Sequence, residues 1–331
     1  MNHGTAPSAF QRAFGAATSW MRDHGPKTLR IMVGLVYLWF GALKFSPDSP
    51  ALDSYLPGAT VHALTFGLLD SAEGVRLLAV WECFIGFCLM TAVLVRPALI
   101  LLLGHLTIMF LPAVIWPHEV WHAFPYGLTL KGQYIVKNLV FVGSALVLAS
   151  RFEPRRDSRA SSDRLSRWIR RRGFTALRIG LGIVYLWFGA LKYFPGVSPA
   201  EHLAARTVET ITFGWMPPPV GLPVLATWEC LIGIGLLASL WPRFILVLIC
   251  VHLLGTFTPL FFFPAEIWTS FPFGLSLVGK YIVRNLVLYG AAIMIGADLA
   301  TRKSRSRLAG RMPPLIRAED PASARPPNVL E

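Results

Sequence analysis

Charged residues are scarce in this chain of 331 residues: they make up 15% of it, whereas apolar residues make up 54%. A soluble protein has about 25% charged residues on average. The uncharged stretches are also long, and several reach the length of about 20 residues that a helix needs to cross a bilayer. The scarcity of charge therefore excludes an ordinary soluble protein of two domains and predicts a membrane protein.

Cysteine is also scarce. The chain has four, all within apolar runs and none in a C-x-x-C pair: Cys83, Cys88, Cys230 and Cys250. A thioredoxin-like exchange site requires such a pair, so we interpret these thiols as buried structural groups. The sequence also lacks the fingerprint of a built-in cofactor. These absences argue against redox chemistry carried out by this chain alone.

Basic residues are numerous, with a formal net charge of +13, but they are confined to three segments. Residues 1–30 have four basic residues against one acidic, 151–178 have ten against three, and 301–331 have seven against three. The remaining chain has ten basic and eleven acidic residues. This is not the patch of a nucleic-acid-binding protein, so we predict no nucleic-acid partner. Basic segments beside apolar blocks are typical of cytoplasmic flanks. They predict a multi-pass protein of the plasma (inner) membrane with both termini in the cytoplasm.

The sequence contains an internal duplication. The stretch LRIMVGLVYLWFGALK at Leu29–Lys44 recurs as LRIGLGIVYLWFGALK at Leu177–Lys192, and later motifs recur about 147 positions apart. Each copy has four apolar stretches, so each copy returns the chain to the side on which it started. The expected fold is all-α: a polytopic membrane protein of eight spans, forming two parallel-oriented four-helix transmembrane bundles.

The predicted domain boundaries follow from this pattern. We expect a disordered cytoplasmic arm over 1–27, a four-helix membrane repeat over 28–150, an Arg-rich cytoplasmic linker over 151–175, a second four-helix repeat over 176–300, and a disordered basic and Pro-rich cytoplasmic tail over 301–331. Below, the two membrane blocks are called repeat 1 and repeat 2.

Ionisable residues recur at one depth in these spans. Three residues of repeat 1 each lie fourteen positions from the basic residue at the cytoplasmic end of their span, which places them about 21 Å above the inner edge of a core about 30 Å thick. They are Lys44, Glu82 and Lys137, and their counterparts in repeat 2 are Lys192, Glu229 and Arg284. The spacing predicts one polar site per repeat, built from two cations and one carboxylate.

Three interpretations of this layer remain open. Buried charges are costly in the bilayer and pair with one another, so the residues can form a structural clasp between helices. Alternatively they bind a ligand or pass a proton, or the lysines extend to the outer interface. Glutamate is too short for that extension. Asn138 and Asn285 follow the cations and can hold a ligand oxygen or make an interhelical hydrogen bond.

Two histidines of the spans also recur between the repeats. His105 and His252 occupy matching positions, about 13 Å above the inner edge, and suit either a packing role or a proton relay. The remaining candidates for a metal site, His118, His122 and His202, have no counterparts in the other half. The sequence therefore predicts no metal site.

Three repeated motifs carry a family resemblance: W-F-G-A-L-K-[F/Y], W-E-C-[F/L]-I-G and G-x-Y-I-V-[K/R]-N-L-V. With them, the chain resembles the DoxX/DoxD-like family of small bacterial membrane proteins over 29–150 and 177–298, as a tandem duplication. The family's Gly-x-x-Lys and Glu-x-x-x-Gly signatures fall on Gly41/Lys44 and Glu82/Gly86, and on Gly189/Lys192 and Glu229/Gly233.

The resemblance implies four-helix membrane bundles and a link to redox chemistry, because the family includes a subunit of thiosulfate:quinone oxidoreductase and proteins tied to oxidative or thiol stress. It suggests a soluble oxidoreductase subunit as partner and a small anion or a quinone as ligand. A small-solute transporter and a scaffold or maturation factor with purely structural charges are the alternatives. Whether the chain is itself an enzyme stays open.

Overall fold

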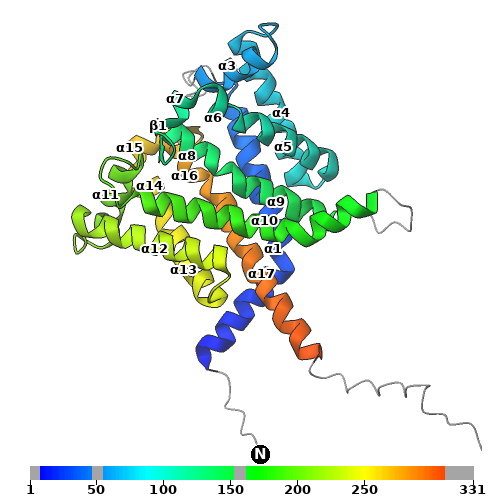
Figure 1. The fold of residues 1–331 in the computed structure, drawn as a ribbon, viewed down its shortest axis with the longest axis vertical. Coiled ribbons are helices and arrows are strands. Elements are labelled where there is room, and N and C mark those ends of the chain that lie inside the picture. Colours follow the sequence, from blue (N-terminus) through cyan, green and yellow to red (C-terminus); the bar gives the residue numbers. More distant parts are fainter. Residues whose placement is uncertain (1–7, 47–54, 153–161, 310–331) are drawn as a thin grey trace, which may run out of the picture.

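The computed structural model describes residues 8–46, 55–152 and 162–309 (Figure 1). Repeat 1 and the segment before it contain α1 (Ala9–Leu43), α3 (Tyr55–Leu64), α4 (Ser71–Thr91), α5 (Val95–Phe110), α6 (Pro112–Ile115), α7 (Pro117–Val120), β1 (Trp121–Ala123), β2 (Gly127–Leu128), α8 (Leu130–Val136) and α9 (Asn138–Arg151). Repeat 2 contains the counterparts α10 (Ser162–Leu191), α11 (Glu201–Ile211), α12 (Pro218–Ala238), α13 (Pro242–Phe257), α14 (Pro259–Phe262), α15 (Pro264–Ile267), β3 (Trp268–Ser270), β4 (Gly274–Leu275), α16 (Leu277–Val283) and α17 (Asn285–Ala309).

The chain is mostly helical, and seven stretches in its described part are long and apolar enough to cross a membrane. They lie at 71–91, 95–115, 130–151, 172–191, 218–238, 242–262 and 277–301. The outer face of α4 supports this environment, because Leu77, Val80, Phe84 and Phe87 are 41–58% exposed. Large apolar side chains on the outside of such a helix are suited to contact with lipid.

The helix contacts of repeat 1 recur in repeat 2. Helix α1 packs along α4, and α10 packs along α12 in the same way. Two glycines of α4 and α12 allow this approach: a Cβ atom on Gly86 would lie 2.3 Å from the Leu38 amide nitrogen, and one on Gly233 would lie 2.5 Å from that of Leu186. These helices therefore meet through their backbones, as small residues permit in membranes.

The two repeats also pack closely against each other. Helix α1 lies along α17, and α10 lies along α9, so the first helix of each repeat contacts the last helix of the other. Figure 1 shows α1 and α17 crossing, with the N-terminal end of α1 and the C-terminal end of α17 diverging below the crossing. One apolar core runs through both repeats and includes Leu29, Phe141, Leu177 and Leu288. The repeats form a joined pair in which each completes the packing of the other.

The expected disordered arm over 1–27 is wrong for its larger part, because α1 already begins at Ala9. Ser8 and Gln11 form a capping box at its start, and such a box satisfies free backbone amides at a helix terminus. Gly25 is buried against Met294 of α17, so tertiary contact supports the helix further along. Residues 1–7 lie outside the described part of the chain.

The other two polar segments also differ from the expectation. Helix α17 continues to Ala309, past the predicted start of a disordered tail at 301, and α10 begins at Ser162, inside the predicted linker. Each polar segment follows or precedes a buried helix directly and extends it. Residues 153–161 and 310–331 lie outside the described part of the chain.

The fold is not purely helical, because each repeat contains a short antiparallel hairpin, β1–β2 or β3–β4. In the first, Trp121 pairs with Leu128 and Ala123 with Gly127. Each hairpin contacts the first helix of the other repeat. Trp187 Nε1 donates a hydrogen bond to the Tyr126 carbonyl (3.0 Å), and Trp39 Nε1 donates to the Phe273 carbonyl (2.9 Å).

Candidate functional site

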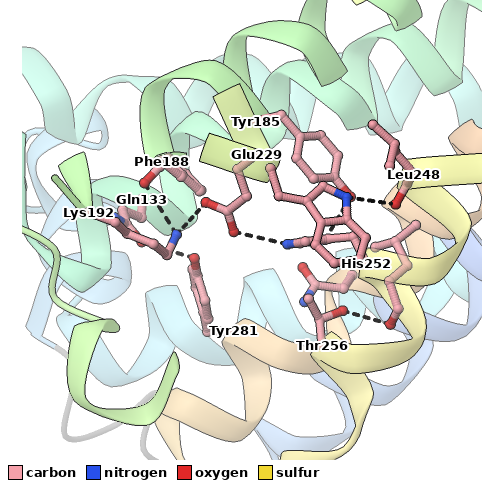
Figure 2. Close-up of polar contacts among 12 residues, drawn as sticks. Gln133, Tyr185, Phe188, Lys192, Glu229, Leu248, His252, Thr256 and Tyr281 are labelled. Carbon is pink, nitrogen blue, oxygen red and sulfur yellow. Dashed lines mark hydrogen bonds and ion pairs between the residues drawn. The ribbon is translucent and has the colours of Figure 1, made fainter. Parts of the chain in front are cut away.

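The clearest polar cluster lies in repeat 2 and joins three helices (Figure 2). Glu229 of α12 lies between Lys192, which follows the last residue of α10, and His252 of α13. Lys192 Nζ is 2.5 Å from Glu229 Oε2, and His252 Nε2 is 3.0 Å from Glu229 Oε1. Tyr185 OH lies 3.2 Å from His252 Nδ1 and extends the row on the far side. Lys192, Glu229 and His252 are all buried.

Repeat 1 contains the same row. Lys44 forms an ion pair with Glu82, and His105 Nε2 lies 3.1 Å from Glu82 Oε1. Tyr37 OH is 3.2 Å from His105 Nδ1. The His105–Glu82 contact lacks hydrogen-bond geometry, unlike its counterpart in repeat 2. Each row carries a carboxylate neutralised by a lysine and backed by a histidine and a tyrosine.

The third residue that the sequence predicted for each site lies instead in the site of the other repeat. The sequence grouped Lys137 with Lys44 and Glu82, but Lys137 lines the cavity beside Glu229 instead. Its Nζ donates to the Asn285 side-chain oxygen (2.9 Å) and the Tyr281 carbonyl (3.0 Å), and lies 3.3 Å from the centre of the Tyr281 ring. The grouping was wrong because the link between α8 and α9 faces repeat 2.

Arg284 makes the reciprocal crossing and lines the cavity beside Glu82. Its guanidinium donates to the Asn138 side-chain oxygen (2.8 Å) and the Tyr134 carbonyl (2.6 Å), and lies 3.7 Å from the centre of the Tyr134 ring. Asn138 and Asn285 therefore hold the opposite repeat's cation by an interhelical hydrogen bond, one of the two roles considered for them. Within the described residues, neither Lys137 nor Arg284 forms an ion pair with a carboxylate.

We name the two clusters by these members. Site 1 is Lys44, Glu82, His105 and Tyr37 with Arg284 from repeat 2. Site 2 is Lys192, Glu229, His252 and Tyr185 with Lys137 from repeat 1.

Several further residues at these sites were missed by the sequence reasoning: Tyr37, Tyr185, Gln133, Tyr134, Lys280 and Tyr281. The four tyrosines do lie in the repeated motifs V-Y-L-W-F and G-x-Y-I-V, and that recurrence was the available signal. The contact of Tyr281 OH with Gln133 Oε1 (2.9 Å) joins the two repeats at site 2.

Site 2 opens into a cavity of about 390 Å³, which we call cavity 2. Apart from the charged cluster, apolar side chains of α10, α11, α12 and α13 dominate its lining, among them Phe188, Leu203, Leu225 and Trp228. Its volume falls in the range of about 300–1,000 Å³ that is typical of small-molecule sites. Cavity 2 thus combines an apolar body with one charged corner.

Site 1 opens into a smaller cavity of about 120 Å³, which we call cavity 1. Its charged lining residues are Lys44, Glu82, Lys131, Lys280 and Arg284. Lys131 forms an ion pair with Glu119 (2.5 Å), and this hydrogen bond holds the pKa of the Glu119 carboxyl below its ordinary value. Cavity 1 therefore has a similar row of residues in a more cationic setting.

The row of residues in site 2 has one consistent hydrogen-bonding scheme. A glutamate neutralised by lysine accepts from His252 Nε2–H, so Nδ1 of the ring accepts from the Tyr185 hydroxyl. The imidazole is thereby fixed between a donor and an acceptor. Such an arrangement can hold a polar ligand atom at the glutamate end or move a proton between adjacent groups.

The remaining polar candidates do not gather into a centre. Among the described residues, no group of three His, Cys, Asp or Glu side chains lies close enough to hold a metal ion. The four cysteines are free thiols.

Comparison with known proteins adds no relative: no family model matches the chain, and neither a curated protein nor a solved structure matches it.

Proposed function

We propose that this chain is a DoxX/DoxD-like protein of the inner membrane that binds a quinone-type ligand in cavity 2. In this role it acts as the membrane subunit or partner of a quinone-linked or thiol/oxidative-stress oxidoreductase system. The observation that carries the proposal is cavity 2 itself, whose apolar body ends at the buried cluster of Lys192, Glu229 and Lys137.

The proposal includes an eighth span and a defined orientation. Helix α1 supplies the additional crossing through its apolar stretch 31–43, which lies between Arg30 and Lys44. Eight crossings put both termini on one side, and the basic flanks place that side in the cytoplasm. The recurring helix contacts support an arrangement as two parallel four-helix bundles.

The lining of cavity 2 suits a flat ring with oxygen substituents and an apolar tail. Lys192 Nζ provides a charged donor for a ring oxygen, and Glu229 and His252 orient that donor. Phe188 and Trp228 offer aromatic surface for the ring, while Leu203 and Leu225 surround the remaining space. The volume of cavity 2 and the chemistry of its lining therefore both suit a quinone-type ligand.

When bound, a quinone would supply the capacity to accept two electrons and two protons. The side chains of this chain would bind, orient and protonate: His252 and Tyr185 form the adjacent pair through which a proton reaches the carboxylate end. The electrons would come from a soluble oxidoreductase subunit.

Binding of a short-chain ubiquinone analogue to the purified full-length protein in detergent tests this proposal. Ala204 of α11 lines cavity 2, so Ala204→Phe fills it without touching the charged row. We expect Ala204→Phe to weaken binding at least tenfold, measured by calorimetry. The matched control Ala63→Phe is at an exposed position near the end of α3, is not among the residues that line either cavity, and should change affinity less than twofold.

Equal affinity in the two variants would show that the analogue does not occupy cavity 2. Failure of the wild-type protein to bind it at all would leave the charged row as a structural clasp.

A further inference from the structure

Cavity 1 differs from cavity 2 in size and in charge. Four cationic side chains line it, of which Lys131 is paired with Glu119 and Lys44 with Glu82, so that Lys280 and Arg284 have no carboxylate partner among the described residues. Cavity 2 has two cations, Lys137 and Lys192, against Glu229. Burying like charges together is unfavourable unless an opposite charge accompanies them. The excess of positive charge in cavity 1 therefore calls for an anion.

Two of these cations retain free hydrogen-bond donors. Arg284 is 5% exposed, and its buried Nε has no hydrogen-bond partner. Lys280 is 6% exposed, and its side chain makes no hydrogen bond or ion pair with any residue that the structure describes. Buried donors are nearly always satisfied, so the unpaired Arg284 Nε needs an explanation. A ligand with several acceptor oxygens would satisfy both.

The repeats show that this feature is particular to cavity 1. Lys280 of α16 corresponds to Gln133 of α8, which accepts the Tyr281 hydroxyl instead of carrying a charge. Lys131 corresponds to Val278, and Arg284 to Lys137. The first two replacements each add a positive charge at cavity 1, and the third exchanges one cation for another. Arginine also presents a fork of donors that matches oxyanions better than lysine does.

Volume limits the size of the anion. An apolar cavity of about 150 Å³ holds one benzene molecule, so the 120 Å³ of cavity 1 suits a ligand of about five heavy atoms. We infer that cavity 1 binds a tetrahedral oxyanion of the phosphate or sulfate type, held by Lys44, Lys280 and Arg284. The oxyanion is either a free ion or the phosphate of a lipid headgroup.

Thermal unfolding of the full-length protein in detergent tests this inference. Sulfate or phosphate should raise the wild-type unfolding temperature above that in chloride at equal ionic strength. Lys280→Gln copies the residue of the other repeat and should weaken the apparent affinity at least tenfold. Arg76→Gln removes an exposed cation of α4 and should leave the affinity within twofold. Neither result depends on quinone binding in cavity 2.

Native mass spectrometry separates the two sources. A phospholipid that stays bound to wild type and is lost from Lys280→Gln identifies a headgroup, whereas stabilisation by inorganic phosphate identifies a free ion. If Lys280→Gln fails to accumulate, Lys131→Gln at the partly exposed rim should weaken binding about threefold. The inference would be overturned if the wild-type protein neither retained a phospholipid nor gained unfolding temperature specifically in sulfate or phosphate. It would also be overturned if the variant tested, Lys280→Gln or Lys131→Gln, bound the anion as tightly as wild type.

Discussion

Sites 1 and 2 share a row of tyrosine, histidine, glutamate and lysine, yet their surroundings differ. Within each repeat the row recurs with closely similar distances, down to 3.2 Å between tyrosine and histidine in both. The cavities differ about threefold in volume, and their cations differ in number. The difference teaches that duplication kept the internal scaffold while the contributions from the opposite repeat diverged.

The divergence is concentrated in one segment. Residues 131–137 of repeat 1 and 278–284 of repeat 2 lie between the two sites. From them Gln133 and Lys137 reach site 2, and Lys280 and Arg284 reach site 1, whereas Lys131 stays at the cavity of its own repeat. Because the sites are assembled across the repeats, a change in one repeat alters the charge of the cavity in the other. The following predictions are arranged to test this view.

Neutralising the carboxylates should have the largest effect. Glu229→Gln leaves Lys192 buried without its partner and should cost about 3–5 kcal/mol of unfolding free energy. Glu82→Gln should cost more, because Glu82 shares its cavity with Lys280 and Arg284 as well as with Lys44. Reversible unfolding in mixed micelles measures both. As a control, Glu266→Gln removes an exposed ion pair with Arg206 and should cost at most about 1 kcal/mol.

Equal losses in Glu82→Gln and Glu229→Gln would contradict the view that the residues of the opposite repeat distinguish the sites. If the double variant is stable and still binds its ligands, the two glutamates have no role in the sites.

Changing the helix contacts should affect the repeats equally. Gly86→Ala and Gly233→Ala each force a methyl group against the backbone of the first helix, at 2.3 Å and 2.5 Å. Overpacking of this kind costs about 1–3 kcal/mol, and the same unfolding measurement should show similar losses. Gly104→Ala is the control, since its nearest neighbouring atom is 3.9 Å from the added carbon. A large loss in one repeat alone would show that the scaffold has diverged as well.

Removing one tyrosine hydroxyl should have the smallest effect, and an unequal one. Tyr281→Phe breaks the hydrogen bond to Gln133 and should cost about 0.5–1.5 kcal/mol. Tyr134→Phe should cost less, because in the described part of the chain the Tyr134 hydroxyl has no such partner. The measurement is the unfolding free energy of the two variants, determined side by side. A greater loss of unfolding free energy for Tyr134→Phe would contradict the assignment of the hydrogen-bonded hydroxyl to Tyr281.

Much of the architecture could be read from residue order. The long uncharged stretches predicted membrane helices because lipid requires a helix to satisfy its own backbone, and the described part of the chain has seven helices that are long and apolar enough to cross a membrane. The spacing of fourteen residues from the basic residue at one end of each span predicted that Lys44 is level with Glu82 and Lys192 with Glu229, since the rise of a helix is constant, and both pairs are in contact. Helical capping and tertiary packing at the polar ends were not foreseen, so α1 and α17 are longer than expected.

The partnership of Lys137 and Arg284 was beyond the reach of spacing. Helical rise sets the depth of a residue, but depth is the same for neighbouring bundles and does not say which of them a side chain faces. That choice depends on how α9 packs against α10 and α17 packs against α1. Residue order thus determined the helices, their duplication and the level of their charges. Only the packing of one repeat on the other decided which charges share a cavity, because contacts between distant segments set the direction of each side chain.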